Sequence, residues 1–415
     1  MRRRVVITGL GTVNPLANSP EETWQRVQSG ESGIRKLTRT DTTDLKTDFG
    51  GEVNDFDPIA LFGRKEARRM DPTTQFAVAA GQWALDDAGV KITDDNRDEI
   101  GVIMGCGMGG MNSIIEGMET VQQKGLSRIS PFYVPMLLAS APSANMGIAY
   151  GVRGPNMAIA TACAAGNNAI GEAARMVERG VSDIMLAGGA EAPLVPLVLA
   201  AFSATGALAV YDGDPSEANR PFDLTRNGFV TGEGATVLVL EELAHAQARG
   251  ARIYGEVLGY GSSSDAYHLS APPEDGEGAA LSMKRALMDA GLQPEDIDYI
   301  NAHGTGTQLN DRAETQAVKT VFGEAAYDVP VSSTKPMHSH LLGAAGALEA
   351  LVCLKAMEHG MLPPTINYET PDPACDLDYV TEGARPAVLN RVMSNGFGLG
   401  GHNATIILGR VNGEV

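Results

Sequence analysis

Cys163, His303 and His340 are the side chains of this sequence whose type and setting best suit nucleophilic chemistry. Cys163 lies in the small-residue run 161–166, just before a segment that favours a helix, where unpaired backbone N–H groups and the helix dipole favour a thiolate. His303 follows a strand-like stretch, and active sites of α/β folds gather at the carboxyl ends of strands. Two neutral imidazoles facing a thiol could donate hydrogen bonds to an oxyanion or move protons near neutral pH.

A repeat links the segments that carry Cys163 and His340. Counting from each of these residues, a Gly follows after three positions, a Glu after nine and an Ala after ten. A second repeat matches residues 84–89 with 286–291, and each copy precedes a strand-like stretch. Ordered repeats of this kind indicate a duplicated unit. We therefore expect two equivalent helix starts, one with a thiol and one with an imidazole, to meet through pseudo-twofold packing.

Strand-like and helical segments alternate along the chain, which is typical of layered α/β architecture. The second half repeats the scheme from about residue 251, and no low-complexity linker separates the halves. We expect the boundary to be a seam within one fold, after a helix over 242–249 that ends at Gly250. The expected strands cover 5–9, 100–105, 184–187, 235–240, 254–258 and 298–302, and the expected helices include 71–88 and 168–179.

The composition describes a large acidic globule. The chain has 415 residues, of which 43% are hydrophobic, so it can bury a large core. Its 32 Lys and Arg against 51 Asp and Glu give a net charge of −19, which argues against nucleic-acid binding. The four cysteines are scattered without a C-x-x-C pair, which indicates neither a disulfide framework nor a zinc site, and therefore a reducing compartment. Three of them, Cys106, Cys353 and Cys375, are interpreted as buried filler.

Two segments deserve a test as membrane or targeting elements. The opening Met-Arg-Arg-Arg resembles the start of a signal peptide, but only residues 5–8 follow before Gly9 and Gly11 interrupt the apolar run. We interpret this segment as a first strand and expect a cytoplasmic protein. The uncharged stretch 192–211 is long enough to span a bilayer, yet its prolines and polar residues make a poor lipid-facing helix. We expect buried core or a partner interface there, and no membrane association.

Two patterns that could hold a metal or a cofactor fail on spacing. His338 and His340 form an H-x-H pair, but no third ligand has convincing spacing, so we expect no metal. Residues 105–110 match G-x-G-x-x-G after a strand, but the acidic residue that a dinucleotide fold needs is missing, because no Asp or Glu occurs between Glu119 and Glu172. This turn is instead interpreted as close packing that could form part of a substrate-pocket wall.

Lys335 and a glycine-rich loop complete the candidate site. Lys335 lies between the two histidines in the sequence, and Glu349 follows on the next expected helix. A buried Lys335–Glu349 pair would set the local field around both imidazoles. Residues 395–402 contain too much glycine for a strand or a helix and predict a tight loop whose backbone amides could line an oxyanion hole.

These segments together resemble the β-ketoacyl-[acyl carrier protein] synthases of the condensing-enzyme family, most of all the type II elongating enzyme. The resemblance runs nearly end to end. Its motifs are Val5-Val-Ile-Thr-Gly-Leu-Gly11, Thr161-Ala-Cys-Ala164, Gly188-Gly-Ala-Glu-Ala192, Arg220-Pro-Phe-Asp223, Gly228-Phe-Val-Thr-Gly-Glu-Gly234, Ala302-His-Gly-Thr-Gly-Thr307, Asn310-Asp311 with Glu314, Ser333-Thr-Lys335, His340-Leu-Leu-Gly-Ala-Ala-Gly346 and Gly396-Phe-Gly-Leu-Gly-Gly401.

The resemblance implies a thiolase fold, with five α-β-α-β-α layers built from two like halves at 1–250 and 251–415. It implies that Cys163 accepts an acyl chain from acyl carrier protein as a thioester. His303 and His340 then promote decarboxylation of malonyl-carrier and stabilise the enolate that attacks this thioester. The backbone amides of Cys163 and Leu399 would hold the tetrahedral oxyanion, and Lys335 would support the histidines.

The family's remaining roles carry over by motif position. The resemblance implies a homodimer without a dissociable cofactor, because phosphopantetheine arrives on the carrier. The implied positions are Thr305, Thr307 and Ser270 for the pantetheine arm, Met108 and Phe202 for the acyl pocket, Phe397 with Leu399 for the gate, Glu349, Asp311 and Glu314 as supporting residues, and the basic cluster Lys65, Arg68 and Arg69 for docking the acidic carrier.

The sequence departs from the family at several of these positions. Leu399 replaces a second gating Phe, and Gly306, His338 and Ser339 replace the Ser, Thr and Gly that the family pattern leads us to expect. Met108 stands where the floor of the pocket is usually set. These departures bear on chain-length selectivity and leave the Cys/His/His set whole.

Three alternatives remain at this stage. A ketosynthase of a polyketide or other specialised pathway shares both chemistry and motifs. A non-catalytic chain-length partner would lack the nucleophile, whereas Cys163 and both histidines are present. A nicotinamide-linked oxidoreductase lacks its ribose-binding acid.

Overall fold

The computed structural model describes residues 2–411, and its centre is a 10-stranded sheet in the order β10-β9-β13-β14-β8-β1-β7-β6-β4-β5. The first half of the chain supplies β1 (Val5–Val13), β4 (Ile100–Gly105), β5 (Asn156–Ile159), β6 (Ile184–Glu191) and β7 (Gly234–Glu242). The second half supplies β8 (Gly255–Ser264), β9 (Tyr299–Asn301), β10 (Val331–Ser332), β13 (Arg391–Gly398) and β14 (His402–Gly409). Two short hairpin-like pairs lie outside it, β2 (Arg35–Lys36) with β3 (Phe49–Gly50) and β11 (Met361–Leu362) with β12 (Arg385–Pro386).

The two halves of the sheet have the same topology. In the first half β1 is antiparallel to β7 and β7 to β6, whereas β6, β4 and β5 are parallel. In the second half β8 is antiparallel to β14 and β14 to β13, whereas β13, β9 and β10 are parallel. Within the sheet formed by residues 2–411, strand pairing links the two halves where Val6 and Ile7 of β1 meet Glu256 and Gly255 of β8. The predicted duplication is therefore confirmed, and the expected seam after residue 250 lies in the connection that leads into β8.

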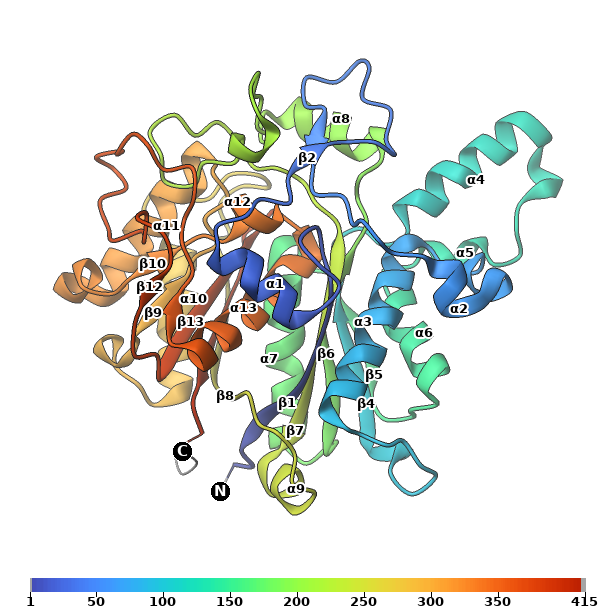
Figure 1. The fold of residues 1–415 in the computed structure, drawn as a ribbon, viewed down its shortest axis with the longest axis horizontal. Coiled ribbons are helices and arrows are strands. Elements are labelled where there is room, and N and C mark those ends of the chain that lie inside the picture. The colour runs from blue at the N-terminus through green and yellow to red at the C-terminus, as the bar shows by residue number, and fades with distance from the viewer. Residues whose placement is uncertain (1, 412–415) are drawn as a thin grey trace.

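Helices form the other layers. Helices α7 and α13 lie between the two half-sheets, α3 and α6 cover the outer face of the first half, and α10 and α11 cover that of the second (Figure 1). These five layers are the predicted α-β-α-β-α arrangement. The helices are α1 (Pro20–Gln28), α2 (Pro58–Ala67), α3 (Pro72–Ala88), α4 (Met111–Lys124), α5 (Tyr133–Leu137), α6 (Ala141–Tyr150), α7 (Ala165–Glu178), α8 (Pro196–Thr205), α9 (Leu243–Ala248), α10 (Glu277–Ala290), α11 (Gln308–Phe322), α12 (Lys335–His338) and α13 (Ala345–His359).

Local sequence signals explain where these helices begin and end. Asp71 caps α3 by accepting a hydrogen bond from the N–H of Thr73, and Pro72 occupies the first turn, where no N–H is needed. Helices α3 and α10 both end at a glycine in the left-handed conformation, Gly89 and Gly291. Helix α13 is apolar on nearly all sides, and residues 345–357 are all buried, as expected for a central helix.

Glycines in β1 allow its outer helix to approach the sheet closely. A Cβ on Gly9 would lie 2.3 Å from the carbonyl oxygen of Ala84, and one on Gly11 would lie 2.0 Å from that of Ala80. The same device recurs in the second half, where Gly259 and Gly261 of β8 face α10 in the same way. The duplication thus extends to the packing of helix on sheet.

Two sequence expectations need correction. Residues 395–402 are not all loop, because β13 continues to Gly398 and β14 begins at His402, which leaves only 399–401 as the turn. A continuous antiparallel register from Arg391–Gly409 to Gly398–His402 outweighs the high glycine content. The register of the repeat is also shifted. The 3₁₀ turns Ala162–Ala164 and Leu342–Ala344 lead into α7 and α13, so the structural counterpart of Cys163 is Gly343 and not His340.

The uncharged stretch 192–211 contains α8 and folds against the body of the protein. Leu194 and Leu199 are buried in one apolar cluster with Cys163. Within residues 2–411, every helix is too short or too polar to cross a membrane.

Candidate active site

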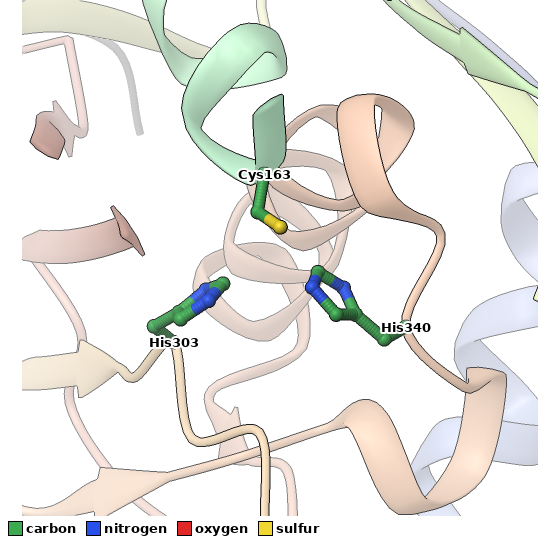
Figure 2. A group of neighbouring side chains, drawn as sticks. All are labelled: Cys163, His303 and His340. Carbon is green, nitrogen blue, oxygen red and sulfur yellow. The ribbon is translucent and has the colours of Figure 1, made fainter. Parts of the chain in front are cut away.

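The backbone delivers Cys163, His303 and His340 to one place from three separate segments. Cys163 lies in the 3₁₀ turn before α7, His303 follows β9, and His340 lies between α12 and α13. One donor atom from each side chain lies within 4.8 Å of the other two. Figure 2 shows the thiol and both imidazoles pointing into the same space. The predicted association of a nucleophile with two histidines is therefore present in the structure.

Hydrogen bonds to the backbone fix His303 at the end of β9. The Glu314 carboxylate accepts from the N–H groups of His303 and Gly304, both at 2.8 Å. Glu314 is fully buried on α11, and burial raises its pKa to about 7. Asp311, one turn earlier, accepts from the N–H groups of Phe222 and Gly306. Both predicted supporting carboxylates thus hold the loop that carries His303.

Backbone hydrogen bonds hold His340 against Val230 and Gly232, just after Phe229. Its N–H donates to the carbonyl of Val230 at 2.7 Å, and its carbonyl accepts from Gly232 at 2.9 Å. The ring packs edge-on against Phe229 and His303, each with ring centroids 5.3 Å apart. The Nδ1 atom of His340 is buried and has no hydrogen-bond partner within residues 2–411.

Burial and a nearby cation keep both imidazoles neutral. Burial lowers the pKa of His303 and of His340 well below the usual value of 6.5, and the Lys335 ammonium lowers both further. Lys335 is fully buried, ion-pairs with Glu349, and places Nζ 3.5 Å from Nδ1 of His303. The predicted Lys335–Glu349 pair therefore exists, and it sets the field around the histidines as expected. Burial raises the pKa of Glu349, against the lowering effect of Lys335.

The thiol of Cys163 has a raised pKa, contrary to the thiolate that its helix-start position led us to expect. Burial raises the pKa to about 11, while Lys335 and the backbone N–H groups of Leu399 and Cys163 act in the opposite direction. Burial dominates because Cys163 lies in an apolar cluster with Leu194, Leu199 and Leu342. The free enzyme therefore holds a thiol, which must lose its proton as it reacts.

A cavity of about 270 Å³ opens from these three residues. The predicted arm-binding residues Thr305, Thr307 and Ser270 line it, as do Phe397 and Leu399. Thr305 and Thr307 hydrogen-bond to each other through their hydroxyls at 3.0 Å. The backbone N–H groups of Leu399 and Cys163 lie close enough to the sulfur to lower the pKa of the thiol, so both are available near the reacting atom.

The predicted acyl-pocket residues take different positions. Phe202 lines the cavity and packs edge-on against Phe229, with ring centroids 5.3 Å apart. Met108 packs against the apolar cluster that contains Cys163 but does not line the cavity itself. Met108 thus contacts the apolar residues around the nucleophile without contributing to the cavity lining.

The predicted docking cluster lies on α2, away from the cavity lining. Lys65 and Arg68 are exposed, as is the neighbouring Arg64, which the sequence reasoning passed over. Arg69 is already engaged, because it bonds Glu66 at 3.0 Å and lies over the ring of Phe132. The exposed basic face is therefore Arg64, Lys65 and Arg68.

Histidine 338 does not join the active-site group. Its Nε2 lies 2.9 Å from Thr334 Oγ1 and its Nδ1 2.7 Å from the carbonyl of Ser339. Cys163, His303 and His340 are close enough together to suit a metal ion geometrically. The positive charge of Lys335 beside His303 opposes a second cation there. The absence of a metal from the site stays a prediction.

Sequence reasoning missed Phe229 and Glu191. Phe229 lies within the quoted segment 228–234, and an aromatic residue in a glycine-rich run was the available signal. Glu191 ends β6 as a fully buried carboxylate, and burial raises its pKa to about 7. Its position in Gly188-Gly-Ala-Glu-Ala192 was noted only as a motif.

The fold and site define a class of condensing enzyme. The family model of the beta-ketoacyl synthase N-terminal domain matches residues 2–246, and that of the C-terminal domain matches 254–369. The chain therefore belongs to the β-ketoacyl synthase family, whose members are acyltransferases with the thiolase-like fold seen here.

Individual proteins of this family are similar to the chain over nearly its whole length. The chain is 48% identical over 405 residues to the 3-oxoacyl-[acyl-carrier-protein] synthase 2 of a Synechocystis strain, covering 98% of this chain and 97% of the relative. It is 45% identical to the enzyme of the same name from Coxiella burnetii, with 99% of both chains covered. Among solved structures, the ishigamide ketosynthase/chain length factor superposes with a TM-score of 0.92 at 38% identity, covering 99% of this chain and 100% of that one. A type II polyketide ketosynthase, solved with its acyl carrier protein, reaches 0.90 at 34%, with the same coverage.

Proposed function

We propose that this condensing enzyme elongates acyl chains on acyl carrier protein by two carbons, as a 3-oxoacyl-[acyl-carrier-protein] synthase of fatty-acid synthesis. The observation that carries the proposal is the meeting of Cys163, His303 and His340 within 4.8 Å in the lining of one cavity. The relatives named 3-oxoacyl-[acyl-carrier-protein] synthase 2 support the same assignment over nearly the whole chain.

The first half-reaction loads Cys163. The sulfur attacks the carbonyl carbon of an acyl thioester, a new carbon–sulfur bond forms, and the bond to the carrier's pantetheine sulfur breaks. The Cys163 proton ends on the departing pantetheine thiol, so atoms and charge balance. Because the pKa of Cys163 is about 11, a neutral imidazole must assist this transfer, and His303 or His340 is within reach.

The second half-reaction condenses malonyl-carrier with the acyl-enzyme. The bond from C2 to the malonyl carboxylate breaks, carbon dioxide leaves, and the electron pair forms an enolate whose oxygen accepts hydrogen bonds from His303 and His340. The enolate carbon attacks the Cys163 thioester, and the N–H groups of Cys163 and Leu399 hold the oxyanion, worth about 3 kcal/mol per donor in other enzymes. Expulsion of the Cys163 thiolate, which takes up one proton, gives the 3-oxoacyl-carrier.

In the proposed reaction, acyl carrier protein supplies the one prosthetic group that is needed, its phosphopantetheine arm. Thr305, Thr307 and Ser270 line the cavity and would bind the phosphopantetheine arm, so the enzyme itself is proposed to need no dissociable cofactor. A solved relative bound to its acyl carrier protein supports this kind of partner. Lys65 and Arg68 would meet the acidic carrier.

A homodimer and a cytoplasmic location complete the proposal. Strand β5 is the outer strand of the sheet, with Met157 41% exposed, and Ile148 of the preceding helix is 80% exposed. An apolar edge of this kind favours pairing with a second copy. All four cysteines are free thiols, which suits a reducing compartment.

Intact-protein mass spectrometry with acyl-carriers of several chain lengths tests the nucleophile. We expect wild type and the control Cys375→Ala to gain one acyl group, and Cys163→Ala to gain none while remaining folded. In Cys163→Gln, malonyl-carrier should lose carbon dioxide without condensation. Acyl transfer or elongation by Cys163→Ala would remove Cys163 from its role.

A polyketide or other specialised pathway is the second candidate, because a type II polyketide ketosynthase superposes with a TM-score of 0.90. The same experiment separates the two functions. Loading by saturated chains supports fatty-acid elongation, whereas loading only by unsaturated or oxo-substituted chains supports the specialised pathway.

A further inference from the structure

Glu191 is a buried carboxylate to which the proposed reaction assigns no role. It is the last residue of β6 and only 1% exposed. Oε2 accepts hydrogen bonds from the N–H groups of Gly107 at 2.6 Å and Gly343 at 3.1 Å. Oε1 accepts from the N–H of Met108 at 3.1 Å, and the Cys106 thiol lies 3.7 Å away. One carboxylate therefore joins the turn after β4 to the turn that leads into α13.

The surrounding backbone leaves room for this carboxylate and nothing more. A Cβ on Gly107 would lie 2.7 Å from Oε2, and so would a Cβ on Gly343. These two glycines come from opposite halves of the chain and approach each other closely, since a Cβ on Gly343 would lie 2.5 Å from the nitrogen of Gly107. The contact therefore needs glycine on both sides and an acceptor between them.

Met108 connects this contact to the nucleophile. Its backbone is held by Glu191, and its side chain packs against the apolar cluster that contains Cys163. The Gly343 side is anchored independently by the start of α13. Glu191 thus ties the Met108 turn to the start of α13 through hydrogen bonds to both.

We propose that Glu191 is a positioning residue that sets the length of alkyl chain accepted at Cys163, by holding the Met108 turn against the start of α13. This proposal deepens the proposed function, on which its biological meaning rests. A group that acts through Met108 should change selectivity for chain length and leave the intrinsic reactivity of the thiol largely alone.

Glu191→Gln tests this with a nearly isosteric change. The amide oxygen can replace Oε2 and still accept from Gly107 and Gly343. The amide NH₂ then occupies the place of Oε1 and faces the N–H of Met108, so two donors oppose each other and the Met108 turn must move. The matched control is Glu172→Gln, which neutralises an exposed carboxylate on α7.

The probe is alkylation of Cys163 by N-alkyl iodoacetamides from methyl to decyl, followed by intact mass. The sulfur displaces iodide, so the measurement needs no carrier and does not depend on the proposed function. We expect Glu191→Gln to relax the wild-type length cutoff, so that chains beyond it gain about tenfold in rate relative to methyl, equivalent to ~1.4 kcal/mol. Glu172→Gln should match wild type.

The pH dependence of wild type gives a second readout that needs no variant. Burial raises the pKa of Glu191 to about 7, so the carboxyl is protonated below that pH and should then behave like glutamine. The other titratable groups that face it are the thiols of Cys106 and Cys163, whose pKa values burial raises, so both stay neutral through this range. The long-to-short rate ratio, in which the thiolate fraction cancels, should therefore rise as pH falls from 8 to 6 in wild type and stay flat in Glu191→Gln.

Two results would overturn the proposal. One is a ratio that is the same in both proteins and independent of pH. The other is an equal loss of rate for all chain lengths, which would make Glu191 a purely structural residue. Acylation by acyl-carriers, measured in parallel, distinguishes a failure of this proposal from a failure of the proposed function. If wild type is alkylated with length selectivity but never accepts an acyl chain, the proposed reaction is contradicted and the role of Glu191 is not.

Discussion

Removing one partner of the Lys335–Glu349 pair should destabilise the protein strongly, whereas removing both should not. Both side chains are fully buried; Glu349 pairs with Lys335 through Oε1, and its Oε2 has no hydrogen-bond partner within residues 2–411. Lys335→Met leaves a carboxylate in an apolar interior, and breaking a buried pair in this way costs about 3–5 kcal/mol. Replacing the pair by Lys335→Met with Glu349→Leu removes both charges at similar volume, so we expect most of that loss to be recovered.

Urea unfolding at one fixed subunit concentration measures the cycle of wild type, the two single variants and the double variant. Malonyl-carrier decarboxylation, measured in the Cys163→Gln background, supplies the functional readout. The double variant should be stable yet slow, because the Lys335 ammonium that acts on His303 is gone. Additive losses in the double variant would refute the reasoning, since they would mean that the two groups do not depend on each other. Full decarboxylation in Lys335→Met would refute the electrostatic role.

Two further predictions concern the docking face and a strained residue. The double variant Lys65→Glu with Arg68→Glu should raise KM for carrier substrates about tenfold, and by more at low salt. The control Lys284→Glu, on the exposed face of α10, should leave KM unchanged. An unchanged KM in the double variant would mean that the carrier docks elsewhere. Ser339 has φ 66° and ψ 179°, a region that side chains rarely adopt and that costs about 1–3 kcal/mol, so Ser339→Gly should stabilise the protein to urea by about 1 kcal/mol after the entropy cost of glycine. Destabilisation would show that the serine contacts with Gly51 and Gly232 outweigh the backbone strain.

The sequence predicted the architecture because the local signals agree with one another. Asp71 and Gly89 mark the ends of α3, and the expected strand over 100–105 is β4 residue for residue. The repeat also predicted the duplicated topology, but its register was wrong by three residues. A shift of three is close to one helical turn, so glycine and alanine fall on nearly the same face in either register, and pattern matching cannot separate the two.

The sequence predicted the site residues that lie in recognisable motifs. It did not predict the properties that arise only when distant segments pack together. Cys163, His303 and His340 could be named from their motifs. The raised pKa of Cys163 could not, because the leucines that bury it come from segments distant in sequence. Glu191 could not be assigned a role because its partner Gly343 lies 152 positions away and contributes only a backbone N–H. The burial of a side chain by distant segments, and a hydrogen bond from a distant backbone N–H, can hardly be recognised from the residue types in the sequence.

In the proposed condensation, the neutral state of both histidines favours the decarboxylation step. Malonyl-carrier brings a carboxylate whose charge must leave the carboxyl group and reach the enolate oxygen. A protonated imidazole would pair with the carboxylate and stabilise the ground state, which raises the barrier. Burial, and after it the Lys335 ammonium, lowers the pKa of His303 and His340, so they remain neutral N–H donors. Such donors can stabilise the negative charge that develops on the enolate oxygen. In the proposed reaction, the Lys335 ammonium, which is paired with Glu349, therefore adds to the effect of burial in keeping both histidines neutral.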